Sequence, residues 1–155
     1  VRLVSPSGER ELAIRDMYRD DGIEYLTKKP GELLREVRLP ARDGWRAVYK
    51  KLRRREAFDF PVLGVAANLR LEGDVVSEAH VFLGGVGSWP IRATGAEEVL
   101  TGNRLDEETI RAAGESAYRP AKPLDNTDFH MTWRKQMVRR YVETALRELA
   151  AGEPV

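Results

Sequence analysis

The sequence predicts an α+β fold, in which an antiparallel sheet of about three strands packs against about three helices. Strand-like segments come first along the chain, and helical segments follow. At residues 72–74, Glu-Gly-Asp forms a tight-turn signal between two apolar runs, which is typical of a hairpin. Residues 129–149 carry apolar side chains at i, i+4 spacing, which indicates an amphipathic helix long enough to cover a sheet.

The first forty residues predict a small β structure of their own. Residues 1–14 alternate weakly around a Pro-Ser-Gly turn at 6–8, which favours a short hairpin. A single helical turn is expected near residues 17–18. Residues 33–39 alternate apolar and charged side chains, and Pro40 ends this strand.

A domain boundary is expected at residues 41–44, where the composition shifts. This gives one domain segment at residues 1–40 and a second domain at residues 45–151. Three strands of the second domain are predicted at residues 45–52, 62–71 and 75–83, and a Gly-rich loop follows at 84–90.

Three helices are predicted after the sheet. The first covers residues 95–100 and ends at Gly102, and the second begins at the N-cap Asp106 and runs to about Ala117. Asp128 opens the third helix, and Gly152 ends it. Its apolar face is built from Phe129, Trp133, Met137, Tyr141, Ala145 and Leu149, joined by Val138, Val142 and Leu146. Its opposite, charged face carries Arg134, Lys135, Arg139, Arg140, Glu143 and Arg147.

Composition excludes several classes of function. The chain has 155 residues, a net charge of +1 and no cysteine. Without cysteine, it offers no thiolate nucleophile, disulfide or cysteine-ligated cluster. With a net charge near zero, it has no overall electrostatic attraction for nucleic acid or an anionic membrane. The absence of cysteine fits a cytoplasmic protein, which is the expected location. No apolar run approaches the length of a membrane span. The chain begins at Val1 in strand-like residues, and we interpret it as a piece of a longer or processed product.

Few side chains suggest catalysis. The two histidines, His80 and His130, lack a metal-binding spacing and are interpreted as a strand-face and a helix-start residue, so no metal site or catalytic residue is assigned. The glycines of residues 84–88 favour a turn rather than a phosphate cradle, because no helix follows directly. The acidic segment 125–128 favours helix capping over a carboxylate pair.

The basic cluster at residues 50–55 is the strongest local signal for binding. Tyr49 precedes it, and Phe58 and Phe60 follow it, so cations alternate with aromatic rings. Such a loop suits a planar ring that carries phosphates, as found in a nucleotide or a dinucleotide cofactor. A solvated, charged strand end explains the same residues without any ligand.

Four ordered stretches carry a resemblance to a known family. They are Pro30-Gly31-Glu32-Leu33-Leu34 with Leu39-Pro40; Tyr49-Lys50-Lys51-Leu52-Arg53-Arg54-Arg55 with Asp59; Leu83-Gly84-Gly85-Val86 with Pro90, Arg92-Ala93, Glu98 and Leu100-Thr101-Gly102; and Lys122-Pro123 with Asp125, Trp133-Arg134-Lys135-Gln136-Met137 and Ala145-Leu146. Together they resemble the FAD-binding medium subunit of the xanthine dehydrogenase and carbon monoxide dehydrogenase family, the molybdenum hydroxylases. Residues 20–30 look most like the 4-hydroxybenzoyl-CoA reductase branch.

This resemblance implies a CO dehydrogenase flavoprotein C-terminal-domain-like fold, preceded by part of an FAD-binding domain. It implies an oxidoreductase in which FAD exchanges electrons with [2Fe–2S] clusters and with an external acceptor or donor such as NAD, a quinone or ferredoxin. The clusters and the molybdopterin would lie on partner subunits. The family's glycine-rich FAD-binding segments would lie upstream, so this chain alone should bind FAD weakly or not at all.

Three residues fall where the family contacts its cofactor. Leu34 matches an aliphatic contact to FAD, Lys50 matches a lysine near the flavin, and Tyr49 matches an aromatic position on the same loop. Plain core packing is the alternative for Leu34 and Tyr49. Two other functions stay open: a scaffold or subunit-docking domain without cofactor contact, and a nucleic-acid-binding module that uses the basic cluster.

Overall fold

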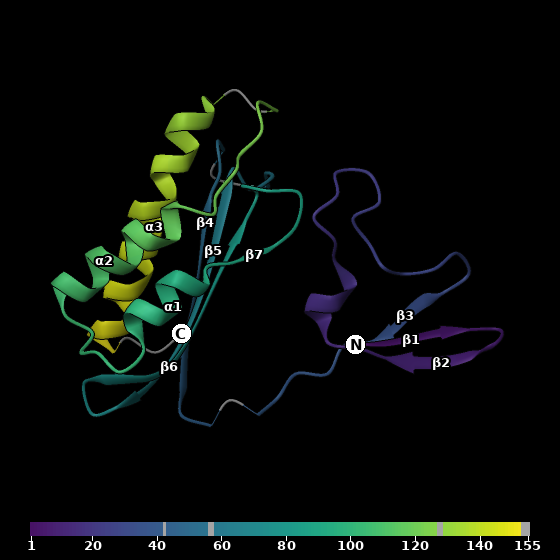
Figure 1. The fold of residues 1–155 in the computed structure, drawn as a ribbon, viewed down its shortest axis with the longest axis horizontal. Helices are drawn as coiled ribbons and strands as arrows, with labels where there is room; N and C mark the ends of the chain where they lie inside the picture. The colour runs from purple at the N-terminus through teal and green to yellow at the C-terminus, as the bar shows by residue number, and fades with distance from the viewer. Residues whose placement is uncertain (42, 56–57, 127–128, 153–155) are drawn as a thin grey trace. The chain divides into compact units, whose positions relative to one another are not determined.

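The computed structural model describes residues 1–155 except 42, 56–57, 127–128 and 153–155 (Figure 1). It separates into two compact units, Val1–Asp43 and Gly44–Val155, each of which is described by itself.

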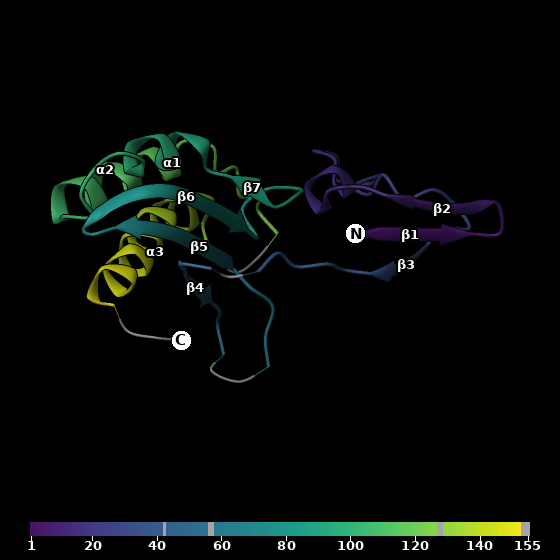
Figure 2. The same ribbon diagram turned by 90° about the horizontal axis from the view of Figure 1, so that it is seen from below.

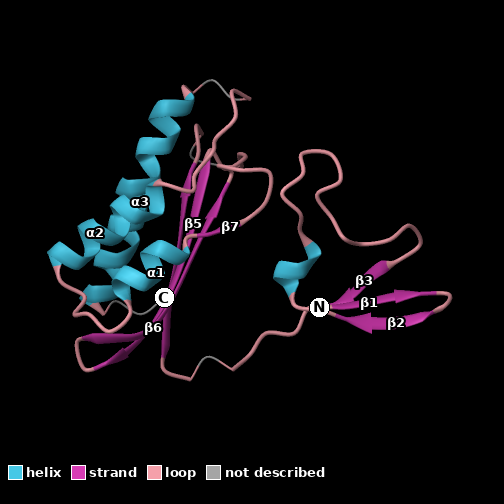
Figure 3. Ribbon diagram, in the orientation of Figure 1, coloured by secondary structure: helices cyan, strands magenta, loops and turns pink. Residues whose placement is uncertain are grey.

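The first unit is a three-stranded antiparallel sheet with strand order β2-β1-β3 (Figure 3). The strands β1 (Arg2–Ser5) and β2 (Gly8–Glu11) form the predicted hairpin, and β3 (Leu33–Glu36) pairs with the other edge of β1. The predicted helical turn is the 3-10 helix η1 (Ile14–Met17). The strand predicted over residues 33–39 ends early, because β1 begins at Arg2, opposite Glu36, and offers no partner beyond it.

This first unit has a very small core. Among its described residues, Leu3 and Met17 are the buried apolar side chains. Its exposed large apolar side chains are more numerous: Ile14, Ile23, Tyr25, Leu33, Leu34, Val37 and Leu39. Two buried apolar side chains cannot offset the conformational entropy of about forty residues. The unit therefore gains little stability from apolar burial of its own.

The second unit is built on a four-stranded antiparallel sheet with strand order β4-β5-β6-β7. Three strands match the prediction: β4 (Trp45–Leu52), β5 (Leu63–Glu72) and β6 (Val75–Gly84). The turn between β5 and β6 contains Gly73 in the left-handed region, at φ +67°. The fourth strand, β7 (Ile91–Arg92), was not predicted, because two residues are too few to show alternation.

Three helices cover one face of this sheet: α1 (Thr94–Leu100), α2 (Glu107–Tyr118) and α3 (Met131–Ala151) (Figure 2). The buried core between them and the sheet includes Val65, Leu69, Val81, Leu83, Leu100, Ile110, Val138, Val142 and Leu146. The predicted fold class is thus observed, with one additional short strand. None of the described helices combines the length and apolarity needed to cross a membrane.

The predicted helix ends are largely confirmed. The Asp106 carboxylate accepts a hydrogen bond from the Thr109 backbone N–H at 2.9 Å, as an N-cap should. Gly152 ends α3 at φ +74°. The predicted cap Asp128 lies outside the described residues, and His130 occupies the N-cap position of α3 without a side-chain capping bond.

Candidate functional site

The sheet face opposite the helices exposes an aromatic ring. Because side chains alternate along a strand, the neighbours of buried Val65 and Ala67 point away from the helices. On β5 these neighbours are Gly64 and Ala66, and on β4 the neighbour is Tyr49, whose side chain is 61% exposed. Ala66 pairs with Tyr49 on one side and with Phe82 of β6 on the other, so an alanine separates two aromatic residues on this face.

Tyr49 lies across β5 because Gly64 has no side chain. A Cβ atom at Gly64 would lie 2.9 Å from the Tyr49 hydroxyl oxygen and 3.4 Å from the nearest ring carbon. A side chain at position 64 would push the tyrosine hydroxyl aside, so the glycine permits the observed position of the ring. Position 64 is therefore a second determinant of this surface, which sequence reasoning missed.

Lys50 points to the other face of the sheet. Its ammonium group forms an ion pair with Glu148 of α3, and both side chains are about 30% exposed. Tyr49 and Lys50 are adjacent in sequence but lie on opposite faces, so a planar ring stacked on Tyr49 would not also contact Lys50. The alternation of side chains along a strand could have shown from the sequence that Tyr49 and Lys50 lie on opposite faces. It could not have shown that Lys50 pairs with Glu148.

Leu34 lies in the first unit, on β3 opposite Leu3, and is 47% exposed. The turn before it is held by Glu32, which is buried. The Glu32 carboxylate accepts from Arg10 Nε at 2.6 Å, Arg10 Nη2 at 2.9 Å and the Lys29 backbone N–H at 2.6 Å. The hydrogen bonds from Arg10 lower the pKa of Glu32 to about 2.

His80 forms one border of the exposed sheet face. Its ring stacks on Trp45 with centroids 5.0 Å apart, and its Nδ1 lies 3.1 Å from Arg92 Nη2. A guanidinium group can only donate, so Nδ1 accepts this hydrogen bond. Arg92 also binds Glu97 at 2.9 Å, which raises the pKa of Arg92 further. His80 is thus a strand-face residue, as the sequence predicted.

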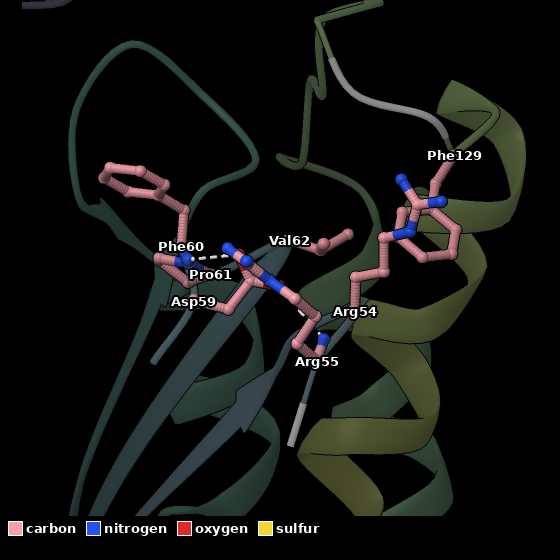
Figure 4. Close-up of a pocket in the computed structure, with 7 residues that line it drawn as sticks. All are labelled: Arg54, Arg55, Asp59, Phe60, Pro61, Val62 and Phe129. Carbon is pink, nitrogen blue, oxygen red and sulfur yellow. Dashed lines mark hydrogen bonds and ion pairs between the residues drawn. The ribbon is translucent and has the colours of Figure 1, made fainter. Parts of the chain in front are cut away.

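A cleft of about 370 Å³ lies beyond the end of β4 (Figure 4). It is lined by Arg54, Arg55, Asp59, Phe60, Pro61, Val62 and Phe129. Phe60 and Phe129 stand at opposite sides of the cleft, and the two arginine side chains extend between them. The basic cluster therefore does meet aromatic rings, as predicted, although Phe129 comes from the segment before α3.

Arg134 is the main residue that the sequence analysis placed wrongly. It was assigned to the charged face of the last helix, but it is 2% exposed. Its guanidinium donates to the Leu124 carbonyl at 2.6 Å, Asn126 Oδ1 at 2.9 Å, the Val62 carbonyl at 3.2 Å and the Gly85 carbonyl. Burial lowers the pKa of Arg134.

A helical-position argument could have found this residue. Arg134 precedes buried Val138 by four positions, so it falls on the apolar side of α3.

One of the carbonyl groups that Arg134 binds belongs to Gly85, in the glycine loop at residues 84–88. A Cβ atom at Gly85 would lie 3.1 Å from the Pro61 carbonyl oxygen, and Gly85 has φ +75°. The loop at residues 84–88 is therefore a packed turn, as the sequence analysis favoured.

Comparison with known proteins gives a consistent result. The profile of the CO dehydrogenase flavoprotein C-terminal domain matches residues 47–149. The medium chain of glyceraldehyde dehydrogenase from Sulfolobus acidocaldarius is 27% identical over 148 residues, which cover 96% of this chain and 52% of that protein. The FAD-binding subunit of an Escherichia coli aldehyde oxidoreductase is 28% identical, covering 88% and 41%.

Solved structures agree. A carbon monoxide dehydrogenase from Hydrogenophaga pseudoflava superposes with a TM-score of 0.87 at 26% identity, over 94% of this chain and 50% of that one. The chain thus spans about half the length of the relatives that it matches. Its α+β fold is that of these flavoproteins.

Proposed function

Because the chain belongs to the family of CO dehydrogenase flavoprotein C-terminal domains, we propose that it is the C-terminal part of an FAD-binding subunit of a molybdenum hydroxylase. The match over residues 47–149 carries this proposal, and the ordered stretches that predicted the family extend it to the first unit. Residues 1–40 are then the tail of the FAD-binding domain, and residues 45–151 are the C-terminal domain.

The proposed role is electron transfer within a larger oxidoreductase. FAD, when bound, would exchange electrons between [2Fe–2S] clusters and an external acceptor or donor. These 155 residues contain no cysteine and so supply no thiolates for such clusters. In the proposal, the clusters and the molybdopterin lie on partner subunits. Three of the relatives are subunits: two are medium chains, and one is the alpha subunit of a dehydrogenase complex. Partner subunits are therefore part of the proposal.

The exposed face of the main sheet is the proposed place for the flavin ring. Tyr49 offers an exposed aromatic ring there, beside the small side chain of Ala66. For Leu34, a contact to FAD stays a prediction from the family resemblance. The glycine loop at residues 84–88 is occupied by packing, so the phosphates of FAD would be held by chain upstream of this sequence.

Lys50 is proposed as a residue that acts on the cofactor only indirectly. Its ion pair with Glu148 ties β4 to α3, and this contact holds the strand that carries Tyr49. A direct contact between Lys50 and the flavin stays a prediction from the family resemblance. It would require the amine to leave Glu148.

The test uses the complete FAD-binding subunit, co-expressed with its partner subunits. We expect Tyr49→Ala to lower FAD occupancy or shift the flavin reduction potential, and Tyr49→Phe to leave both close to normal, since the ring rather than the hydroxyl supplies the contact. Flavin absorbance and potentiometry measure these effects. An assembled enzyme that carries no flavin, or a Tyr49→Ala enzyme with normal occupancy and potential, would favour the alternative of a docking domain without cofactor contact.

A further inference from the structure

Three side chains form a row, here called the stacking row, on the face of the main sheet that the helices leave open (Figure 2). Tyr49 of β4 pairs with Ala66 of β5, which pairs with Phe82 of β6. Phe82 pairs in turn with Arg92 of β7, so Arg92 lies at the end of the stacking row. Residues that lie directly opposite each other on neighbouring strands share one face of a sheet. Two aromatic rings and a guanidinium group therefore lie on the same face.

Two partners fix the guanidinium group of Arg92. Its Nε lies 3.0 Å and 2.9 Å from the two carboxylate oxygens of Glu97, and its Nη2 donates to His80 Nδ1 at 3.1 Å. Glu97 is itself 7% exposed and accepts from the Val81 backbone N–H at 2.9 Å. Within the described part of the chain Nη1 has no hydrogen-bond partner, and the Arg92 side chain is 40% exposed. The cation is therefore held in place while one of its donor groups remains available to a ligand.

A second row, here called the donor row, consists of Asn68, His80 and Arg92 and lies beside the stacking row. Asn68 of β5 is exposed and pairs with His80 of β6, two residues along the strands from Ala66 and Phe82. The Trp45 ring reaches across β5 from β4 and stacks on the His80 ring. Because His80 Nδ1 accepts from Arg92, the ring hydrogen of His80 lies on Nε2, which can donate. The donor row thus offers N–H groups along one side of the stacking row.

We propose that the stacking row lies against the flavin ring and that the donor row, above all Arg92, binds the edge of the ring that carries its carbonyl oxygens. The inference rests on the proposed function, which places FAD on this face. Three strand spacings, about 14 Å in all, separate β4 from β7, so a tricyclic ring fits between Tyr49 and Arg92. One edge of a flavin is apolar and the other carries hydrogen-bond acceptors, and the two rows match this difference.

This placement lets Arg92 act on the charge of the cofactor. Reduction of a bound flavin by two electrons from the [2Fe–2S] clusters and one proton from solvent leaves one negative charge on the ring. A cation at the carbonyl edge attracts this anionic form more strongly than it attracts the neutral, oxidised form. The Glu97 carboxylate lies on the Nε side of the guanidinium group, so the Nη1 side presents the positive charge. Arg92 should therefore raise the reduction potential of the flavin.

The experiment measures the reduction potential of FAD in the complete FAD-binding subunit, assembled with its iron–sulfur and molybdopterin subunits. The test variant is Arg92→Gln, whose side-chain amide can still donate to Glu97 but carries no charge. Arg92→Lys restores the charge. The matched control is Arg104→Gln, which removes an exposed arginine of the same unit that pairs with Asp74 at 2.5 Å. Circular dichroism and the melting temperature show whether each variant is folded.

We expect Arg92→Gln to lower the affinity for reduced FAD, relative to the affinity for oxidised FAD, at least tenfold, which lowers the flavin potential by about 30 mV. Arg92→Lys should recover most of this loss, and Arg104→Gln should leave the potential unchanged. If Arg92 only closes the edge of the sheet through Glu97, Arg92→Gln will lower the melting temperature and leave the potential as it is in wild type. That result would overturn the role given to Arg92.

A second variant tests the stacking row and does not depend on the stability of the first. Ala66→Leu places a larger side chain between Tyr49 and Phe82, on the open face of the sheet. It should weaken the binding of FAD by the flavin-free subunit at least tenfold. Its control is Ala112→Leu, at an exposed alanine of α2. Wild-type affinity in Ala66→Leu would place the flavin elsewhere and refute the inference.

The outcomes separate this inference from the proposed function. If the assembled wild-type enzyme carries no flavin, the proposed function itself fails. The enzyme could instead carry flavin, while Arg92→Gln keeps the wild-type potential and Ala66→Leu keeps the wild-type affinity. The proposed function would then stand, and the two rows would not be the flavin site.

Discussion

Replacing Arg134 by methionine should destabilise the second unit by about 3 kcal/mol. The side chain makes four hydrogen bonds, to Leu124, Asn126, Val62 and Gly85, and all four acceptors are uncharged. A hydrogen bond to a charged group contributes roughly 1.5–3 kcal/mol, and an acceptor left without a partner costs about 1–3 kcal/mol when water cannot reach it.

Several effects reduce the sum of these terms. Methionine removes the cost of burying a cation, which is several kcal/mol, and it fills much of the same volume. Some of the released carbonyl oxygens lie close enough to the surface to bind water. The Arg134 Nε has no hydrogen-bond partner among the described residues, so its loss costs nothing. A net loss of about 3 kcal/mol is what remains, and it corresponds to a melting temperature lowered by roughly 10 °C.

Urea and thermal unfolding of the Arg134→Met and Arg140→Met variants measure this effect. Arg140 is an exposed arginine of the same helix, so its replacement should change stability by less than about 0.5 kcal/mol. Hydrogen exchange should also accelerate in the three segments that Arg134 joins. The reasoning is refuted if the two variants are equally stable, because the buried guanidinium would then contribute nothing beyond its volume.

Three further outcomes are expected. Gly64→Ala should displace the Tyr49 ring, because the Tyr49 hydroxyl would lie 2.9 Å from the new Cβ. Ultraviolet difference spectroscopy should show this displacement. The substitution should lower the free energy of unfolding by less than about 1 kcal/mol, since the mobile end of the tyrosine side chain can move. In a double-mutant cycle, Lys50→Met and Glu148→Gln should show a coupling free energy of about 0.5–1 kcal/mol, the range expected for a partly exposed ion pair. Additive effects of the two substitutions on stability would contradict the ion pair. The pKa of Glu32 is lowered to about 2, so its contribution to stability is complete above the unfolded-state pKa of about 4.3 and is lost as pH falls towards 2. Exchange of the Lys29 amide should therefore accelerate in this acid range, and Glu32→Gln should remove the dependence.

The elements that sequence analysis predicted well are those governed by local chemistry. The tight turn at residues 72–74, the Asp106 cap and the Gly152 stop each follow from one or two residues. The missed features depend on contacts between distant segments. The two-residue strand β7 exists because Phe82 and Leu83 of β6 offer it partners. Likewise, no short-range pattern in the sequence predicts that Arg134 of α3 binds carbonyl groups far from it along the chain.

In the candidate site too, local features could be predicted from the sequence, whereas features set by packing could not. The family resemblance singled out Tyr49 and Lys50 together, and the strand prediction for residues 45–52 was correct. Alternation along that strand already implies that neighbouring residues cannot share a face. Which of the two faces remained exposed depended on where the helices packed, and the sequence does not specify that locally. Resemblance thus located the strand, while the packed structure decided which side chain can meet a planar ring.

The exposed apolar surfaces of this chain differ in chemistry, and this difference argues against one ligand or partner that binds all of them. The first unit exposes aliphatic side chains such as Leu33 and Leu34 on both faces of β3, and a strand with apolar side chains on both faces suits contact with further protein. The main sheet exposes the aromatic ring of Tyr49 instead, which suits a planar group. Variants of Tyr49 therefore test the proposed cofactor contact without changing any residue of the first unit.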